Sequence, residues 1–340
     1  MKFGPIPTAA AEGKLLGHNI AAADGRRALR KGRVLSAADV ALLHQLGRDV
    51  VYVAELEPGD VLEDAAAGRV AAAVAGPHLR HTGPTTGRVN LYATALGLLR
   101  VDAARLLALN EQPGITLATL RHNTAVSPAK MVATVKIIPY AVPETAVRAV
   151  EALQAAGPLV HVDPLPNRRV DLLLSGSPAA RERIVGSFDP PLRQRIEQLG
   201  STLASVDFIP LEDEHGERAL AEAICQRVAA GSGLLLLAGE TAIMDAEDIA
   251  PRAVRRAGGS LTVVGAPVDP GNLLMLAAVG DVPLLGAPGC ARSPKANIVD
   301  ALLPRLLAGD RLTRADVLAL GHGGLLEDVP ERPFPRSRIQ

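Results

Sequence analysis

The chain of 340 residues has few aromatic side chains: no Trp, three Tyr and four Phe. Proteins that bind single-stranded nucleic acid stack bases on aromatic rings, so this composition disfavours that class. The formal net charge is zero, with 36 basic and 36 acidic residues, so no bulk field attracts a nucleic-acid backbone or an anionic membrane. Both absences point to a small-molecule partner and away from nucleic acid.

Cysteine is also scarce, since the chain holds two, Cys225 and Cys290. No CxxC motif or Cys/His cluster predicts a zinc site or a disulfide framework, and two thiols fit a reducing compartment. The N-terminus has no apolar signal segment, and no apolar run approaches the roughly 20 residues that cross a bilayer. We therefore expect a cytoplasmic protein without a membrane partner.

What the chain does have is enough apolar sequence for more than one domain, since 48% of its residues are hydrophobic. A proline-punctuated stretch at residues 157–167 interrupts helices and central strands and predicts a boundary near residue 165. We expect an N-terminal domain over residues 1–165, a second domain over 166–312 and a C-terminal extension over 313–340.

The first domain mixes helical and strand signals. Ser36 followed by Asp39 resembles a capping box and predicts a helix through Leu46, with a strand at 50–54 after it. A turn at 55–60 leads into a second predicted helix that ends near Val74. Further strands are predicted at residues 88–93, 98–101, 115–120 and 131–138. The N-terminal domain is therefore expected to be α+β.

The second domain is more regular, because short apolar runs alternate with helical segments. The predicted strands are 170–174, 204–209, 234–238, 261–264 and 282–285, and the predicted helices are 192–199, 217–229 and 251–257. Continuous apolar strands joined by crossovers indicate a parallel sheet covered by helices on both faces. We expect a three-layer α/β domain.

Loops after the strands of such a sheet are the candidate ligand sites, because ligands bind beyond the carboxyl ends of parallel strands. The hydroxyls and open amides of the first loop suit a phosphate or a carboxylate, although an ordinary helix cap explains it equally well. Glycine and proline in the later loops let backbone amides approach a ligand. The candidates are Ser175, Gly176, Ser177, Gly239, Glu240, Thr241, Pro270, Gly271, Asn272, Pro288, Gly289, Cys290, Arg292 and Ser293.

Three acidic residues follow the loop at 239–241, namely Asp245, Glu247 and Asp248. Such a cluster would hold Mg²⁺ against ligand phosphates, because this hard cation prefers carboxylate oxygens and retains several waters. The alternative is that Glu247 and Asp248 favour the positive N-terminus of the helix that begins near Pro251. Cys290 in a ligand loop would contact the ligand, or else serve as a small packing residue. Arg292 would pair with a ligand phosphate, or else lie on the surface in contact with solvent.

Three of these loops resemble motifs of one family. Residues 239–247 resemble a family motif that consists of a glycine pair, a stretch with hydroxyl side chains and the pattern GD-x-D. Residues 286–293 keep the Gly, Pro, Gly and Ser of a second family motif, G-x-P-G-N-P-x-S. Pro270 and Gly271 keep the core of a lysine-proline-glycine-lysine-proline motif without its lysines. Over about residues 165–310 the chain resembles the molybdenum cofactor biosynthesis domain of molybdopterin adenylyltransferases and molybdotransferases.

The whole chain looks still more like a divergent bacterial subgroup of molybdopterin-binding proteins. Some members of that subgroup are fused to a nucleotidyltransferase that resembles molybdenum cofactor cytidylyltransferase. The segments that carry this likeness are residues 131–139, 269–272 and 288–293. The sequence shows no nucleotidyltransferase segment after this region, so we expect cytidylyl transfer to need a separate nucleotidyltransferase as partner.

The resemblance implies molybdopterin or adenylylated molybdopterin as ligand, with Mg²⁺ at Asp245 and Asp248. Asp189 corresponds to a family aspartate in the first crossover helix and completes the expected catalytic set. The implied activity is that of a transferase, by molybdate insertion or adenylyl transfer. The alternative is a non-catalytic carrier that delivers the cofactor to a nucleotidyltransferase or an apo-enzyme. Relatives of the domain form dimers or trimers, so a homo-oligomer is expected.

Overall fold

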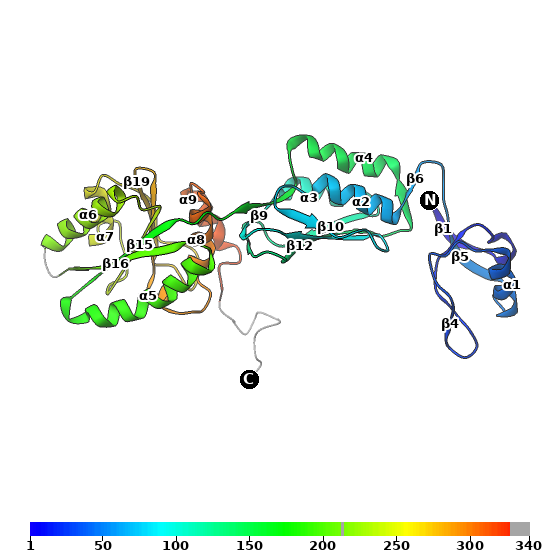
Figure 1. The fold of residues 1–340 in the computed structure, drawn as a ribbon, viewed down its shortest axis with the longest axis horizontal. Helices are drawn as coiled ribbons and strands as arrows, with labels where there is room; N and C mark the ends of the chain where they lie inside the picture. Colours follow the sequence, from blue (N-terminus) through cyan, green and yellow to red (C-terminus); the bar gives the residue numbers. More distant parts are fainter. Residues whose placement is uncertain (212–213, 327–340) are drawn as a thin grey trace. The chain divides into compact units, whose positions relative to one another are not determined.

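The computed structural model describes residues 1–211 and 214–326. The chain divides into two compact units (Figure 1). Unit 1 comprises Met1–Ala95 and Leu99–Asp163, and unit 2 comprises Leu96–Leu98 and the chain from Pro164 onward. Helices and strands occur in both, so the expected mixed α/β class is confirmed.

The N-terminal part of unit 1 is a small antiparallel sheet with one helix. Its strands β1 (Lys2–Pro7), β5 (Val50–Glu55) and β2 (Leu15–Leu16) lie in the order β1-β5-β2, and β3 (Ile20–Ala21) pairs with β4 (Arg27–Leu29). The helix α1 (Ala37–Gln45) begins with the predicted capping box. Asp39 donates its amide to Ser36 Oγ at 3.2 Å, and Ser36 donates its own to Asp39 Oδ2 at 3.0 Å.

The rest of unit 1 is an antiparallel sheet covered by helices. Its strands lie in the order β10 (Ile115–Thr119), β12 (Met131–Ile137), β8 (Arg88–Ala93) and β7 (Leu79–His81). The alanine-rich α2 (Glu63–Val74) buries Ala66, Ala67 and Val70 against this sheet. The remaining elements are β6 (Asp60–Leu62), β9 (Gly97–Val101), α3 (Ala103–Asn110), β11 (Ala125–Val126), β13 (Ala141–Pro143), α4 (Glu144–Ala152) and β14 (Val160–Pro164).

Unit 2 contains a six-stranded sheet. Its order is β16 (Thr202–Pro210), β15 (Arg169–Gly176), β17 (Leu234–Gly239), β20 (Val282–Gly286), β19 (Met275–Val279) and β18 (Ser260–Val264). The first four strands are parallel, whereas β19 runs antiparallel to both of its neighbours. The expectation of a wholly parallel sheet thus missed β19, which forms a hairpin with β20 around Gly280 and Asp281.

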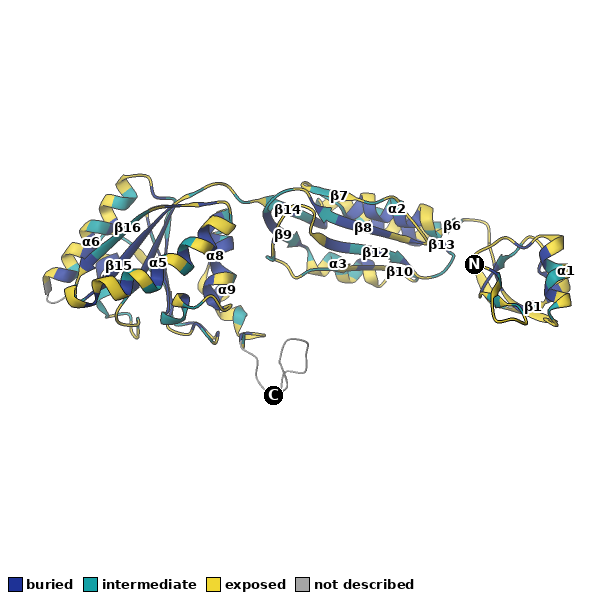
Figure 2. Cartoon of the chain, turned by 60° about the horizontal axis from the view of Figure 1, so that its bottom comes forward, coloured by how far each residue is buried: buried dark blue, intermediate teal, exposed yellow. Residues whose placement is uncertain are grey.

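Helices cover both faces of this sheet, as Figure 2 shows by the buried strands between helices with exposed outer surfaces. Leu172, Leu236 and Leu285 face α5 (Arg181–Gln198) and α8 (Ile298–Ala308). The adjacent Leu173, Leu235 and Leu284 face α6 (Glu214–Ala229) and α7 (Ile249–Arg256), because successive strand residues point to opposite faces. A short helix, α9 (Arg314–Leu318), follows α8.

The helix predicted at 192–199 is the second half of α5, which begins at Arg181. Pro190 and Pro191 lie inside this helix, so α5 extends further toward the N-terminus than the predicted range. None of the described helices combines the length and the apolar character that crossing a membrane requires.

Candidate functional site

The register of the unit 2 sheet aligns the ends of its strands. Ser175 pairs with Gly239, Leu237 pairs with Gly286, and Met275 pairs with both Gly286 and Val264. The loops that leave β15, β17, β20 and β18 therefore share one edge of the sheet, which we call the carboxyl edge. These loops, with the last residues of β15 and β17, carry every predicted site residue except Asp189, which lies in α5.

The first two loops are joined by a carboxylate. Glu240 Oε2 accepts hydrogen bonds from the backbone amide and the hydroxyl of Ser177, both at 2.9 Å, and Glu240 Oε1 pairs with Arg183 at 2.8 Å. The amide of Ser177 lowers the pKa of Glu240 most, followed by its hydroxyl and by Arg183. The amide and hydroxyl of Ser177, which the sequence suggested as donors to a phosphate, thus bind the carboxylate of Glu240.

Two glycines allow these loops to touch. A Cβ on Gly239 would lie 2.6 Å from Ser175 Oγ, and one on Gly176 would lie 2.6 Å from Ile184 Cδ1 and 2.9 Å from Glu240 Cβ. The amide of Glu240 also donates to Ser175 O at 2.8 Å. Gly176 and Gly239 therefore serve the packing of the two loops, because any side chain there would force them apart.

The acidic residues after Gly239 bond mainly within their own loop. Asp248 is the N-cap residue of α7, but its Oδ2 accepts the amides of Met244 at 2.6 Å and Asp245 at 2.9 Å. Asp245 Oδ1 accepts the amide of Glu247 at 2.8 Å, and Glu247 pairs with Arg255 at 2.9 Å. Over residues 1–211 and 214–326 no three His, Cys, Asp or Glu side chains group as metal ligands.

A cavity of about 350 Å³ opens at the carboxyl edge beside these loops. Its polar side chains are Ser175, Thr241 and Asp248, which come from the β15 and β17 loops and the start of α7. Its remaining lining is apolar or glycine and consists of Leu211, Leu237, Ala238, Gly239, Ala242, Ile243, Met244, Ile249, Ala250 and Ala287. Apolar walls with a few polar groups are typical of small-molecule sites.

The proline-glycine loop lies against the start of α8. Gly271 has φ of +143°, and a Cβ there would lie 2.5 Å from Ile298 Cγ2. Pro270 O accepts the amide of Ile298 at 3.3 Å, and Asn272 O accepts the amide of Ala266 at 2.9 Å. This loop is therefore fixed by its own backbone contacts.

The loop after β20 is held from beneath by a residue that the sequence interpretation missed, Arg195 of α5. Arg195 is 8% exposed, and its guanidinium donates to the carbonyl oxygens of Ser293 at 2.8 Å, Lys295 at 3.0 Å and Ala291 at 3.3 Å. It also pairs with Asp300 at 2.8 Å. Its spacing in the sequence could have indicated that Arg195 faces the protein interior, because it follows the buried Leu192 by three residues and shares its helix face.

The other predicted residues of this region are engaged locally. Arg292 lies 5.1 Å from the centre of the Phe188 ring, and its Nε donates to Gly289 O at 3.0 Å. Cys290 is half-buried, and burial raises the pKa of its thiol, so the thiol is protonated at neutral pH. Asp189 pairs with Arg193 at 2.9 Å on the outer turns of α5 and does not line the cavity.

Comparisons with known proteins give remote likenesses. Residues 5–55 match a family described as "Domain of unknown function (DUF8806)". No curated protein matches the chain. The solved structures that are similar to it include molybdenum cofactor biosynthesis proteins.

A molybdenum cofactor biosynthesis protein from Pyrococcus furiosus is 12% identical, with a TM-score of 0.24, over 94% of this chain and 65% of that one. The molybdopterin biosynthesis moea protein from Pyrococcus horikosii is 12% identical, with a TM-score of 0.30, over 91% of this chain and 75% of that one. Molybdenum cofactor biosynthesis protein B is 13% identical, with a TM-score of 0.30, over 42% of this chain and 96% of that one. The chain thus spans less than two thirds of the first structure, and likeness at this level assigns no activity.

Proposed function

We propose that unit 2 binds molybdopterin or adenylylated molybdopterin at its carboxyl edge and acts in molybdenum cofactor biosynthesis. The observation that carries this proposal is the meeting of the motif-bearing loops at one edge, beside a cavity of about 350 Å³. The sequence motifs of these loops resemble those of the molybdopterin-binding domain, and the sheet brings them together.

The lining of the cavity suits a flat heterocycle with polar edges. Its apolar wall, with Leu211, Ile243 and Met244, offers contact area to a flat ring. The hydroxyls of Ser175 and Thr241 supply hydrogen bonds at the cavity's polar side. A pterin has this combination of flat faces and polar edges.

Mg²⁺ is part of the proposal, with Asp245 and Asp248 as its protein ligands. The donor set fits, because each carboxylate uses one oxygen for the described loop amides and leaves its second oxygen for a cation. Mg²⁺ is commonly bound by one or two carboxylates together with ligand phosphates and water. When bound, it would neutralise phosphate charge, and molybdate would be a substrate.

Delivery of the cofactor, without catalysis, is the version that the contacts favour. The amide and hydroxyl of Ser177 are occupied by Glu240, and the proline-glycine loop has no lysines and uses its backbone on α8. Phosphoryl transfer relies on many donors and cations around the phosphates. A carrier that passes the cofactor to a nucleotidyltransferase or an apo-enzyme needs fewer of them.

Calorimetric titration with molybdopterin and with its adenylylated form, with and without Mg²⁺, tests the proposal when the products are analysed in the same samples. Asp245→Asn and Asp248→Asn should each weaken binding about tenfold in Mg²⁺ and have little effect without it, since the substitution removes one charge. Asp281→Asn is the matched control, because Asp281 lies in the hairpin at the opposite end of β20.

Binding without turnover supports the carrier, whereas magnesium-dependent release of AMP or incorporation of molybdate supports an enzyme. Absence of binding to either pterin refutes the function proposed for unit 2. Equal loss in the control and the two site variants refutes the assignment of Asp245 and Asp248.

A further inference from the structure

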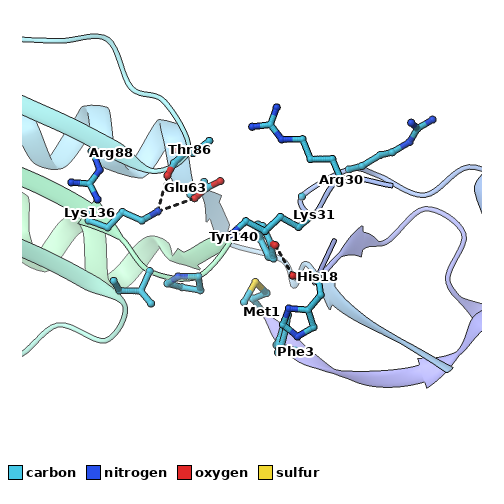
Figure 3. A pocket seen from close by; sticks show the side chains of 15 residues that line it. Met1, Phe3, His18, Arg30, Lys31, Glu63, Thr86, Arg88, Lys136 and Tyr140 are labelled. Carbon is cyan, nitrogen blue, oxygen red and sulfur yellow. Dashed lines mark hydrogen bonds and ion pairs between the residues drawn. The ribbon is translucent and has the colours of Figure 1, made fainter. Parts of the chain in front are cut away.

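Unit 1 contains a second and larger cavity, of about 1080 Å³ (Figure 3). Five cationic side chains line it, although the chain as a whole carries no net charge: Arg30, Lys31, Arg33, Arg88 and Lys136. Among the described residues that line the cavity, one side chain is acidic, that of Glu63. Such an excess of one sign in a concave site concentrates anions there.

The cations come from opposite walls of the cavity. In Figure 3, Arg88 and Lys136 stand on one side with Glu63, and Arg30 and Lys31 stand on the other. Arg88 and Lys136 belong to β8 and β12, whereas Arg30 and Lys31 follow the short strand β4. An anion between these walls is therefore within reach of positive charge from more than one side.

Three of the five cations have no protein partner among the described residues. Arg33 pairs with Asp39 at 2.9 Å, and Lys136 Nζ donates to Thr86 O at 2.6 Å and lies 3.4 Å from Glu63. Within residues 1–211 and 214–326, no hydrogen bond or ion pair engages the side-chain nitrogens of Arg30, Lys31 or Arg88. Their charges repel one another unless an anion compensates them.

The floor of the cavity is fixed by Tyr140. Its hydroxyl donates to Gly17 O at 2.8 Å, which ties the segment before β13 to the loop before β3. A Cβ on Gly32 would lie 3.2 Å from Tyr140 Cε1, so the loop that carries Lys31 also lies close to this ring. Two contacts thus connect the parts of unit 1 from which the cations come.

Aromatic rings lie beside the charges. His18 is 5.7 Å from Phe3 in an edge-on arrangement and 5.3 Å from Tyr52, and both Phe3 and His18 line the cavity. The cavity therefore offers rings for a planar group as well as cations for an anion.

We propose that this cavity binds a small molecule with a di- or triphosphate group. Arginine guanidinium groups match phosphate oxygens in pairs, and several cations around one space favour more than one negative charge. The volume exceeds what inorganic phosphate fills and is comparable to that of small-molecule sites, whose upper range is about 1,000 Å³. A small molecule is favoured over a nucleic-acid polymer, since these five cations line one cavity of limited volume.

In this proposal the negative charge of Glu63 weakens the binding of the anion. Its carboxylate partly neutralises Lys136 and adds negative charge beside the proposed ligand. Glu63→Gln keeps the size of the side chain and removes that charge. Binding should become about threefold tighter, a gain that damage to the fold would not produce.

Calorimetric titration of the full chain with tripolyphosphate, and separately with ATP, tests the site. The variant Arg30→Ala/Lys31→Ala/Arg88→Ala should weaken binding by about 30-fold at low salt, because it removes three positive charges that would pair with the phosphates. The matched control is Arg121→Ala/Arg218→Ala/Arg314→Ala, which removes three exposed cations outside the cavity and should change binding less than twofold. Circular dichroism reports whether each variant is folded.

Each outcome decides the proposal. Tighter binding of ATP than of tripolyphosphate assigns the ligand to the nucleotides, and equal binding assigns recognition to the polyphosphate group. The proposal is overturned when neither probe binds, when the control weakens binding as much as the cavity variant, or when Glu63→Gln leaves the affinity unchanged. The site in unit 2 is tested separately, because the residues changed there, Asp245 and Asp248, do not line the unit 1 cavity.

Discussion

Arg195 provides a direct test of what holds the carboxyl edge of unit 2 in shape. Arg195→Met keeps most of the apolar stem but removes a buried guanidinium that bonds three carbonyl oxygens of the loop at 291–295. The two shorter bonds, to Ser293 and Lys295, should each contribute about 1 kcal/mol or more, because the donor is charged. The Asp300 carboxylate is 39% exposed, so solvent screening limits its pair with Arg195 to about 0.5 kcal/mol.

The sum predicts that Arg195→Met lowers the free energy of unfolding of unit 2 by about 2.5 kcal/mol. Urea unfolding followed by circular dichroism measures this, since the chain has no Trp for fluorescence. With a slope near 2 kcal/mol per molar urea, the midpoint should fall by about 1.2 M. Arg193→Met is the control, because its pair with Asp189 is a half-exposed pair within one helix and should cost about 0.5 kcal/mol. A loss below 1 kcal/mol for Arg195→Met, or equal losses in the two variants, refutes the reasoning.

Other substitutions and conditions give further predictions. Gly271→Ala should lower the urea midpoint of unit 2 by about 1 to 2 M, because a methyl group there would meet α8 and φ is +143°; an unchanged midpoint contradicts this. Iodoacetamide should alkylate the exposed Cys225 before Cys290, whose thiol pKa is raised by burial, as peptide mass spectrometry will show. Hydrogen bonds from Arg69 lower the pKa of Glu144 to about 2, so their stabilising effect is complete above about pH 4.5 and disappears as the pH falls to 2. Arg69→Met should flatten this part of the acid unfolding curve, and an unaltered curve counts against the pair.

The sequence predicted the parallel strands of unit 2 because they are buried on both faces and read as continuous apolar runs. The run from Leu234 to Ala238 is an example, and β17 covers it in full. β19 was missed although Gly280 and Asp281 between two apolar runs are a hairpin signal. The predicted range 192–199 left out the first half of α5, which precedes the two prolines at 190 and 191, residues that usually interrupt a helix.

The sequence also placed the candidate loops, because strand ends follow from strand positions, but it could not assign side-chain roles within them. Glu240 bonds Ser177 across 63 positions of the chain, a contact that depends on how β15 and β17 pair. The cationic cavity of unit 1 was missed for the same reason, since Arg30 and Arg88 are distant in sequence and meet through the fold. Side-chain partners of this kind are tertiary, and local patterns do not contain them.

Hydrogen exchange with mass spectrometry, in the presence and absence of molybdopterin and Mg²⁺, tests the binding site in unit 2 most directly. The account predicts slower exchange of amides in residues 239–250 and 286–293, which line or adjoin the cavity, and unchanged exchange in β1 and β5 of unit 1. Protection confined to unit 1, or no protection at a pterin concentration that saturates binding, would contradict the proposal that the carboxyl edge of unit 2 is the pterin site.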